Sequence, residues 1–395
     1  MIEVIFVLMK FPVKSEVFAT NEVIRLSQQN DIRLTVVSYR QLSETDKMTL
    51  NELNISNITI VTPEAPKSLN DFIQFMKNVT ISMFHLAKIT QKFNKEFFKQ
   101  ILIILLSSAL AVQLRKKKIN VIHLFWGHYP SWLLYYFKSD KRLKKILFLG
   151  AYDLELKLPI SIDMAKNFSD YVITHSNVGV QKLKALDIPS DLIRLSYRGI
   201  DIEKLTSSQS MRLLPFKDRH GCISAGRLIP EKNFFEMVAY FCEILPRHPL
   251  SIYGNGPDEK RIIDFLQSKN KSLVNLKGFS TQTDLFNAFC QKKFFIFLSE
   301  KPGEILPNVV KEAMLARCVV ICKSIPGIDE LIETGVDGFL INSYNEIDEI
   351  LSLPQQKLEI ISERAFNKIT ENFSIDSTII NYKTVWGCTD ENTGG

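Results

Sequence analysis

The sequence is poor in cysteine and lacks the paired spacings of a metal site or a disulfide framework. Its cysteines all lie in the second half, mostly in apolar runs where a thiol acts as a small hydrophobic side chain. They are Cys222, Cys242, Cys290, Cys318, Cys322 and Cys388. No second His or Cys pair accompanies Cys318 and Cys322, so we predict no metal site. Reduced thiols further indicate a cytoplasmic protein.

A long apolar run and a basic leader are also missing. The longest apolar run, Ile101 to Leu114, is shorter than the roughly 20 residues that cross a bilayer. The opening "MIEVIFVLMKF" carries Glu3 inside a short apolar run, which suits a first strand better than a signal peptide. We therefore expect no membrane-spanning segment.

What the chain does have is size, apolar content and an uneven charge. Its 395 residues are 46% hydrophobic, which favours two domains of ordinary size. Residues 1–200 hold 27 Lys and Arg against 17 acids, a balance of +10, whereas the rest hold 22 against 26, a balance of −4. The two halves are therefore expected to meet different partners.

Short apolar strand patterns alternate with helical patterns along the whole chain. Strands that are apolar throughout and separated by helices indicate parallel sheets covered on both faces, and hence two doubly wound α/β domains. The strand patterns are "IEVIFVLM", "RLTVVSY", "ITIVT", "NVIHLFW", "KKILFLGAYD", "DYVITHS" and "IRLSY", then "GCISAG", "LSIYG", "VNLKG", "FFIFLS", "VVICKS" and "GFLIN".

The aperiodic, polar stretch around Pro215 marks the boundary between the domains. We predict an N-terminal domain at 1–204, a linker at 205–219 and a C-terminal domain at 220–370. A helix at 371–386 returns to the first domain, and a disordered tail at 387–395 follows it.

Four motifs follow strands of the second half in a fixed order: "GRLIPEKN", "YGNGP", "GEILPNVVKEAM" and "PGIDELIETGVDGFLI". Ligands of open α/β sheets bind beyond the carboxyl ends of the strands, so these motifs are expected to meet at one crevice. Pro307 suits a first helical position, where free amides and the helix dipole form a pocket for an anion such as a diphosphate. Glu312, five residues on, lies about 7–8 Å along the helix.

This series resembles the C-terminal domain of glycosyltransferase family 4, the retaining, nucleotide-sugar-dependent enzymes of the GT-B fold, whose hallmark is Glu-x7-Glu. The resemblance implies that Glu312 binds the ribose hydroxyls and Glu304 the hydroxyls of the donor sugar. It implies that Arg227 and Lys232 bind the diphosphate while charge builds on it. The remaining donor-binding residues are expected to be Gly226, Gly254, Gly256, Ile305, Leu306, Pro307 and Asn308. The chain departs from the family at "ARCVV", where Arg317 and Val319 replace a small-Gly-x-Pro pattern.

The first half carries weaker parts of the same resemblance. "FPVKSEVFATNEVIRL" is similar to the opening of family members that build exopolysaccharide and lipopolysaccharide. Ser15 and Glu16 are therefore expected to bind the acceptor, although Ser15 would also suit a helix N-cap. "RGIDIEKL" and "ENFSIDSTIINYKTVW" resemble the domain junction and the returning helix, so the resemblance covers nearly the whole chain.

The segment "LGAYDLE" lacks a histidine that many family members have. Gly150 stands in the place of this histidine, and Asp153 keeps the acid of the motif. Either the leaving phosphate takes the proton of the acceptor, or His128 of "FWGHYPSW" reaches the same crevice and takes it. A structural role for His128 in an aromatic cluster is the alternative. The predicted catalytic set is Arg227, Lys232, Glu304, His128 and Asp153.

Lysines flank an apolar stretch from Lys88 to Lys118, and Lys138 to Lys145 adds further positive charge. One interpretation is a surface that approaches anionic lipid headgroups, and the other is a buried helix that ends in solvated lysines. We favour the membrane contact. No nucleic-acid module accompanies the basic stretch, so we expect no nucleic-acid partner.

The sequence thus predicts an α/β protein of GT-B architecture, with two Rossmann-like doubly wound parallel-sheet domains facing a central cleft. The predicted activity is a retaining, metal-independent hexosyltransferase of bacterial surface polysaccharide or lipopolysaccharide biosynthesis. It is expected to be cytoplasmic and peripheral at the inner face of the cell membrane, with a glycan or lipid-linked oligosaccharide as acceptor. No cofactor is expected beyond the substrate, a UDP-sugar first and a GDP-sugar second.

Two other functions remain open. One is a non-catalytic nucleotide-sugar or glycan-binding subunit of a synthesis complex, which Gly150 favours. The other is a sugar-phosphate synthase or phosphorylase on the same fold, which would use a soluble phosphorylated acceptor.

Overall fold

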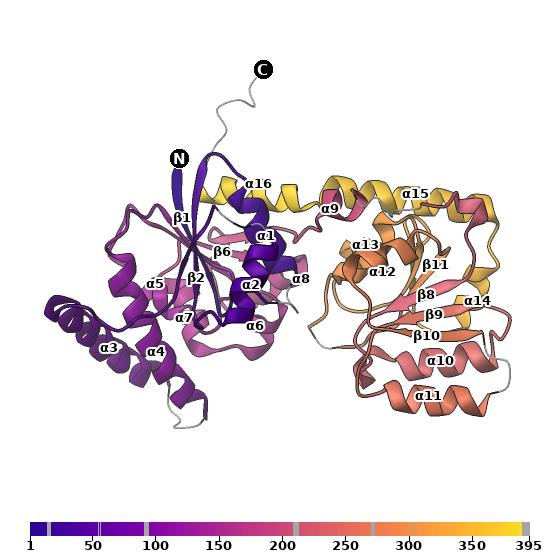
Figure 1. Cartoon of the computed structure of the whole chain (residues 1–395), viewed down its shortest axis with the longest axis horizontal. Helices are drawn as coiled ribbons and strands as arrows, with labels where there is room; N and C mark the ends of the chain where they lie inside the picture. The colour runs from indigo at the N-terminus through magenta and orange to yellow at the C-terminus, as the bar shows by residue number, and fades with distance from the viewer. Residues whose placement is uncertain are drawn as a thin grey trace, which may run out of the picture. The chain divides into compact units, whose positions relative to one another are not determined.

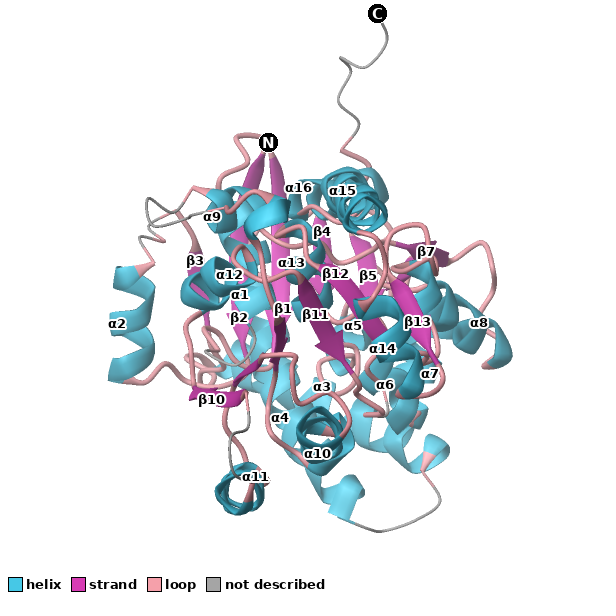
Figure 2. Ribbon diagram, turned by 90° about the vertical axis from the view of Figure 1, so that its right-hand side faces the viewer, coloured by secondary structure: helices cyan, strands magenta, loops and turns pink. Residues whose placement is uncertain are grey.

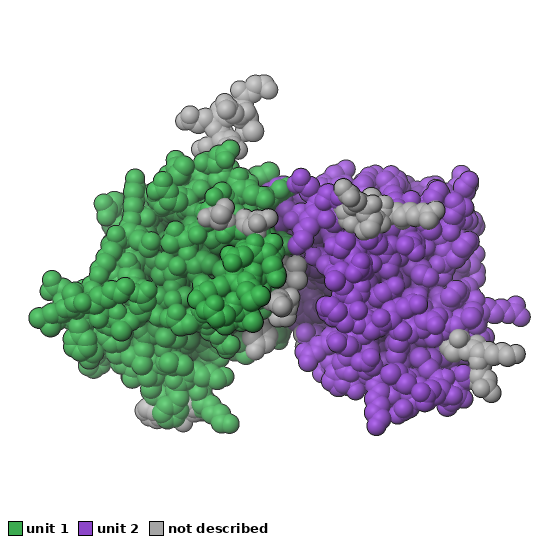
Figure 3. All heavy atoms as spheres, viewed as in Figure 1, with its two compact units in different colours: residues 1–197, 378–395 green, residues 198–377 purple. Residues whose placement is uncertain are grey.

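The computed structural model describes residues 1–13, 17–53, 55, 57–90, 95–207, 213–269, 273–301 and 303–388. The chain divides into two compact units (Figures 1 and 3). Unit 1 comprises Met1–Tyr197 and Thr378–Gly395, and unit 2 comprises Arg198–Ser377.

Unit 1 is built on a seven-stranded parallel sheet in the order β3-β2-β1-β4-β5-β6-β7. The middle strands are buried on both faces, as their uninterrupted apolar sequences require. The strands are β1 (Ile2–Leu8), β2 (Ile32–Ser38), β3 (Thr59–Val61), β4 (Val121–Leu124), β5 (Lys144–Phe148), β6 (Tyr171–Thr174) and β7 (Ile193–Leu195).

Helices connect and cover these strands. A long crossover of two helices, α3 and α4, joins β3 to β4, and α3 lies at the outer side of unit 1 (Figure 1). The helices are α1 (Val17–Ser27), α2 (Glu44–Glu52), α3 (Leu69–Ile89), α4 (Lys95–Leu114), α5 (Trp132–Tyr136), α6 (Ala151–Leu156), α7 (Pro159–Asn167), α8 (Asn177–Ala185) and the returning α16 (Ile375–Trp386).

Unit 2 has a six-stranded parallel sheet in the order β10-β9-β8-β11-β12-β13. Its strands are β8 (Cys222–Ala225), β9 (Leu250–Tyr253), β10 (Val274–Gly278), β11 (Phe294–Phe297), β12 (Val319–Lys323) and β13 (Phe339–Ile341). Its helices are α9 (Ile202–Thr206), α10 (Phe234–Glu243), α11 (Glu259–Ser268), α12 (Gln282–Phe289), α13 (Asn308–Leu315), α14 (Asn345–Leu351) and α15 (Gln355–Asn372). Short 3-10 turns lie at Phe216–Asp218, Pro230–Lys232 and Ile328–Glu330.

The prediction of two doubly wound parallel-sheet domains is confirmed. Each sheet starts in the middle, winds outward to one edge and then returns to the centre to wind the other way, with helices between successive strands (Figure 2). Every predicted strand pattern forms a strand, because each apolar run is short and bounded by polar or glycine residues.

The units divide earlier in the chain than the predicted linker at 205–219. Unit 2 already begins at Arg198, and the backbone of Ile200, five residues before the predicted linker, pairs with Ser374 of the same unit. Leu205 is buried, and Phe216 packs in the core of unit 2. The described part of 205–219 is therefore part of a folded domain. Residues 208–212, and 389–395 of the predicted tail, lie outside the described residues.

Helix α4 is longer than the apolar run that the sequence analysis identified. By length and composition alone its 20 residues are apolar enough to cross a membrane. However, 56% of the apolar window is buried inside unit 1, and the helix packs against α3 and α5. A buried core helix passes the same test, so this is weak evidence for a membrane span.

The last helix, α16, completes the core of unit 1. The Tyr382 hydroxyl donates to Glu22 Oε2 at 3.0 Å, and Trp386 Nε1 donates to His123 Nδ1 at 3.2 Å. Ile379, Tyr382 and Trp386 are buried against the strands of the sheet. The first 200 residues therefore depend on a segment at the other end of the chain.

This dependence gives a stability prediction. Trp386→Ala removes a large buried ring and is expected to destabilise unit 1 by about 3–5 kcal/mol. Ile380→Ala on the same helix is the matched control, because Ile380 is 61% exposed; its expected cost is below about 0.5 kcal/mol. Urea unfolding followed by circular dichroism measures both. Equal effects of the two substitutions would contradict the assignment of α16 to the core.

Candidate active site

The predicted donor motifs of unit 2 lie at the carboxyl ends of its central strands. Gly226–Asn233 follows β8, Gly254–Pro257 follows β9, and the segment after β11 leads into α13. Backbone hydrogen bonds join the first two loops: Gly226 N donates to Tyr253 O at 3.0 Å, and Leu228 N donates to Asn255 O at 2.9 Å. The parallel sheet thus brings segments far apart in sequence to one edge.

Gly254 and Gly256 are required where these two loops touch. A Cβ on Gly254, which has a φ of +136°, would lie 1.9 Å from the carbonyl oxygen of Gly226. A Cβ on Gly256 would lie 2.3 Å from the carbonyl oxygen of Leu228. Both glycines therefore allow close contact between two backbone segments. Their predicted contact with a nucleotide stays a prediction.

Lys232 and Glu304 form a direct ion pair in this loop cluster. Lys232 Nζ lies 2.6 Å from Glu304 Oε1, and the side chains are only 11% and 19% exposed. The Ser299 hydroxyl donates to Glu304 Oε2 at 2.6 Å, and Lys232 Nζ lies 5.0 Å from the centre of the Phe297 ring. Burial lowers the pKa of Lys232, and the charge and hydrogen bond of Glu304 oppose this effect. The pair holds a partly desolvated positive charge at the strand ends.

Arg227 is exposed in the same loop as Lys232. The structure therefore brings Lys232 and Glu304 together. The side chain of Arg227 is exposed to solvent.

The start of α13 differs by one residue from the prediction. Pro307 has an extended backbone (φ −62°, ψ 131°) and is the cap residue, so Asn308 is the first helical residue. Ile305 and Leu306, just before it, are buried. They anchor the loop that delivers Glu304, while the amides of the first turn remain at the strand-end edge of the sheet.

The sequence analysis missed Lys311, which is 1% exposed inside this helix. Its ammonium donates to the Arg198 carbonyl at 2.7 Å and to Asn308 Oδ1 at 3.2 Å. It thus joins α13 to the first segment of unit 2. A lysine in an apolar helical pattern gives no sequence signal that separates a buried position from a solvated one.

Glu312 is buried with a different partner. Gln282 Nε2, from the first residue of α12, donates to Glu312 Oε1 at 2.7 Å. Burial raises the pKa of Glu312 to about 7, although the hydrogen bond from Gln282 and the charge of Lys311 both lower it. Sequence reasoning missed Gln282, because it lies 30 residues away from Glu312 on another helix.

In unit 1, the structure brings His128 and Asp153 together at the carboxyl ends of β4 and β5. His128 Nδ1 and Asp153 Oδ1 are 2.7 Å apart. Asp153 Oδ2 accepts the backbone amide of Gly150 at 2.9 Å, so the same carboxylate also caps α6. The His128 ring contacts the Trp126 and Tyr129 rings, as the structural alternative predicts. The carboxylate fixes the orientation of an imidazole inside an aromatic cluster.

Another histidine lies next to Gly150. A Cβ on Gly150 would lie 2.9 Å from Phe148 Cε1 and 3.6 Å from His175 Cε1. The Phe148 and His175 rings stack at 5.8 Å. The space beside Gly150 is thus filled by the last residue of β5 and by the residue that follows β6. Sequence analysis missed His175, although "THS" at the end of a predicted strand was a usable signal.

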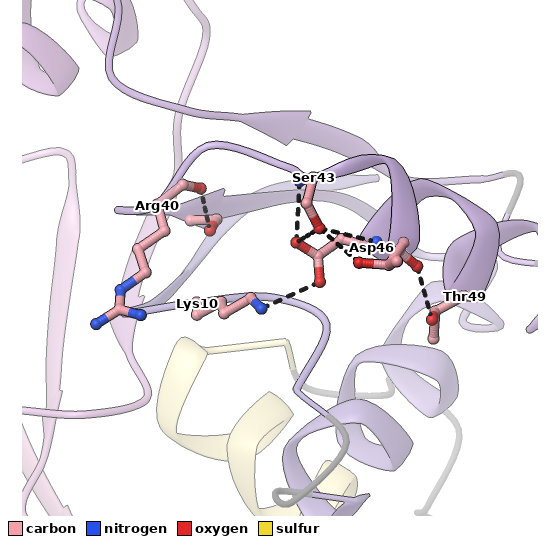
Figure 4. Close-up of polar contacts among 7 residues, drawn as sticks. Lys10, Arg40, Ser43, Asp46 and Thr49 are labelled. Atoms are coloured by element: carbon pink, nitrogen blue, oxygen red, sulfur yellow. Dashed lines mark hydrogen bonds and ion pairs between the residues drawn. The ribbon is translucent and has the colours of Figure 1, made fainter.

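The predicted acceptor residues Ser15 and Glu16 lie outside the described residues. Nearby, Lys10 follows β1 and Arg40 follows β2, and both are cations that sequence analysis missed (Figure 4). Lys10 Nζ lies 3.1 Å from Asp46 Oδ1. Asp46 and Ser43 form the capping box of α2, and hydrogen bonds from Ser43 hold the pKa of Asp46 below its ordinary value. The charge of Lys10 is thus balanced by Asp46.

Comparisons with known proteins agree with this architecture. Residues 209–367 match the sequence model of the family described as glycosyl transferases group 1. WcaL of Salmonella typhimurium, provisionally named a colanic acid biosynthesis glycosyltransferase, is 24% identical over 221 residues, which are 52% of this chain and 53% of WcaL. The chain thus spans about half the length of that relative. YtcC of Bacillus subtilis, provisionally named a glycosyltransferase, is 23% identical over 67% of this chain and 69% of YtcC.

Among solved structures, the complex of Anabaena HepE with UDP-glucose is similar in fold. Its TM-score is 0.64 at 16% identity, over 98% of this chain and 100% of HepE. The likeness to HepE covers both units and shows a shared two-domain fold of GT-B architecture, and the family match at 209–367 lies within unit 2.

The raised pKa of Glu312 predicts how stability depends on pH. The folded pKa of about 7 lies above the ordinary value of 4.5, so the folded chain holds this proton more tightly than the unfolded chain. The stability linked to the protonated acid is complete below about pH 4.5 and is lost as the pH rises through about 7. The wild type loses this stability between pH 4 and pH 8, and Glu312→Gln does not. The free energy of unfolding of Glu312→Gln, relative to that of the wild type, should therefore rise by about 3 kcal/mol over this range.

Urea unfolding of both proteins across this pH range measures the difference. Glu300→Gln is a control of opposite sign, because a hydrogen bond from Lys323 holds the pKa of Glu300 below its ordinary value. Identical pH profiles for the wild type and Glu312→Gln would rule out the buried, proton-binding carboxyl.

Proposed function

We propose that the protein is a retaining glycosyltransferase of family 4 that moves a sugar from a nucleotide diphosphate donor to a glycan acceptor. The observation that carries this proposal is the partly buried Lys232–Glu304 pair at the carboxyl ends of the strands, in a domain that matches glycosyl transferases group 1. Glu312, eight residues after Glu304, is the second acid of the predicted Glu-x7-Glu motif.

The proposed donor is a UDP-sugar, with a GDP-sugar as the second choice. The UDP-glucose complex of HepE supports this order, since the two chains share a fold. Lys232 and Arg227 bind the diphosphate, and Glu304 binds the hydroxyls of the sugar. Glu312 binds the ribose, and the amides at the start of α13 face the phosphates. A carboxyl with a pKa of about 7 can accept or donate a hydrogen bond near neutral pH.

The proposed chemistry uses charge already present in unit 2. The bond between the anomeric carbon and the diphosphate oxygen breaks, and the acceptor oxygen forms its new bond on the same face of the sugar. Negative charge grows on the leaving diphosphate, and Lys232 and Arg227 stabilise it without a bridging metal. In the absence of donor, Glu304 balances the charge of Lys232 at 2.6 Å. We therefore infer that Lys232 exchanges this carboxylate for phosphate when the donor binds.

The acceptor proton passes either to the leaving phosphate or to His128. Asp153 holds the His128 ring in place through Nδ1, as a carboxylate does for a catalytic imidazole. Lys10, Arg40, Ser15 and Glu16 are assigned to the acceptor, which we propose to be a lipid-linked glycan of exopolysaccharide or lipopolysaccharide biosynthesis. The name of WcaL supports the polysaccharide pathway. The proposed location is the cytoplasmic face of the cell membrane.

The second candidate is a non-catalytic sugar-nucleotide or glycan-binding subunit. The observation that favours it is Gly150, whose missing side chain leaves a place filled by Phe148 and His175. Donor binding without turnover, with any acceptor offered, would support this candidate.

The ion pair gives the first kinetic prediction. Lys232→Ala should lower kcat/KM by about 100-fold or more, because it removes a fixed positive charge aimed at the leaving diphosphate. Glu304→Gln should lower it by a similar factor. Nucleotide release from a panel of UDP- and GDP-sugars measures both, and Glu300→Gln, an acid at the same strand end that pairs with Lys323, is the control. Full activity of Lys232→Ala would remove the basis of the proposal.

The contact between His128 and Asp153 gives the second kinetic prediction. If His128 takes the acceptor proton, His128→Asn should lower kcat about 100-fold with little change in KM. Asp153→Asn should lower kcat less and should also lower thermal stability, because Asp153 caps α6. An unchanged kcat for His128→Asn would assign the proton to the leaving phosphate and leave His128 a structural role.

A further inference from the structure

Exposed apolar side chains are concentrated on two neighbouring helices of unit 1. Of the 20 large hydrophobic side chains that are exposed in the described residues, nine lie on α3 and α4. These are Leu69, Phe72, Ile73, Met76, Ile81, Phe84, Phe98, Leu102 and Leu105. Scattered single exposed hydrophobics are ordinary, but a contiguous group of this size marks an interaction surface.

Helix α3 buries several polar side chains against the protein and turns much of its apolar surface to solvent. Asp71, Asn78 and Ser82 are buried, beside the apolar Leu86. Asn78 Nδ2 donates to the Ser108 carbonyl at 3.5 Å, and the Ser82 hydroxyl donates to the Tyr136 hydroxyl at 2.8 Å. The opposite face, with steps of three and four residues, carries Leu69, Ile73, Met76 and Phe84, which are 74%, 57%, 43% and 69% exposed.

A surface helix of a globular domain usually turns a polar face to solvent, and α3 instead exposes a row of apolar side chains. We call this exposed face of α3, with Phe98, Leu102 and Leu105 on the first turns of α4, the apolar ridge. The ridge residues of α4 follow the same spacing; Lys95 is exposed just before them, and Lys99 is exposed among them.

The exposed charges of α3 and of the first turns of α4 are positive, and Glu96 of α4 is half-buried. Within the described parts of α3 and of α4 up to Leu105, every exposed charged side chain is a lysine: Lys77, Lys88, Lys95 and Lys99. The acid of α3, Asp71, is buried and paired with Lys116 at 2.8 Å. This pair also brings the basic segment Lys116–Lys118 to the amino end of α3.

We propose that the apolar ridge inserts into the interface of an anionic lipid bilayer. Aromatic and aliphatic side chains bordered by lysines match both parts of such a surface, the acyl boundary and the negative headgroups. A second copy of the chain fits less well, because a symmetric contact would place the lysines of one ridge against those of the other.

The proposal extends the membrane contact that the sequence suggested. More than half of the apolar window of α4 is buried, but Phe98, Leu102 and Leu105 lie within Lys88–Lys118 and are exposed, and the ridge residues of α3 precede this stretch. The proposal adds a surface to the proposed membrane location, and it does not depend on the proposed reaction.

Vesicle sedimentation of the full chain tests the proposal. Wild-type protein should bind vesicles of phosphatidylcholine with phosphatidylglycerol, and bind phosphatidylcholine alone about tenfold or more weakly. Ile73→Asn with Phe84→Asn should weaken binding to the anionic vesicles about tenfold or more. Lys77→Gln with Lys88→Gln should weaken binding to the anionic vesicles and reduce its salt dependence. Phe279→Asn is the matched control, since Phe279 is a 77% exposed aromatic residue in unit 2.

Tryptophan fluorescence separates insertion from adsorption. Phe84→Trp should shift its emission to shorter wavelength on anionic vesicles and be quenched by brominated acyl chains, whereas Phe279→Trp should show neither effect. Equal vesicle binding by the wild type and the Ile73→Asn, Phe84→Asn variant would overturn the proposal. So would a wild-type dimer that this variant converts to monomers without loss of vesicle binding.

Turnover of the donor with a soluble acceptor, measured without vesicles, should be unchanged in the ridge variants. Loss of vesicle binding with full turnover therefore tests the ridge alone, and loss of turnover in Lys232→Ala with full vesicle binding tests the reaction alone.

Discussion

The ion pair between Lys232 and Glu304 is the contact on which the candidate active site depends. It joins the loop after β8 to the loop after β11, across 72 residues of sequence. Burial disfavours the charged form of this lysine and lowers its pKa, and the carboxylate opposes this effect. We propose that this positive charge, already in place at the strand ends, stabilises the leaving group once an anion replaces the carboxylate.

The parallel sheet of unit 2 brings the loops of the candidate site to one edge. Buried polar contacts around α13 then hold this helix and its side chains in place. Gln282 fixes Glu312, and Lys311 ties the helix to the segment at Arg198.

The turn after α13 shows how a departure from the family pattern is accommodated. Arg317 stands in a left-handed conformation (φ 60°) where the resemblance expects a glycine. Its guanidinium pairs with Glu363 and lies 4.2 Å from the Phe366 ring centre, so contacts with α15 offset the backbone strain.

The sequence predicted the strands and the two-domain fold because both depend on local patterns of apolar and polar residues. It named Lys232, Glu304, His128 and Asp153, but it did not predict which of them touch, since their contacts join separate strand ends. Gln282 was missed because its contact with Glu312 joins two helices that lie far apart in sequence. Lys311 was missed because an apolar helical pattern does not show which of its lysines is buried. The face of α3 was missed because periodicity shows that a helix has two sides and does not show which side is buried. The packing of Asn78 and Ser82 against α4 and α5, together with the burial of Leu86, identifies the buried side.

The central claim is that Lys232 leaves Glu304 to bind the diphosphate of the donor. A crystal structure of the protein with a nucleotide diphosphate tests this most directly. The account predicts a phosphate oxygen at about 2.7–3.1 Å from Lys232 Nζ, at the amino end of α13, with the contact to Glu304 opened or shared. A nucleotide bound elsewhere, with Lys232 still paired to Glu304 alone, would contradict it.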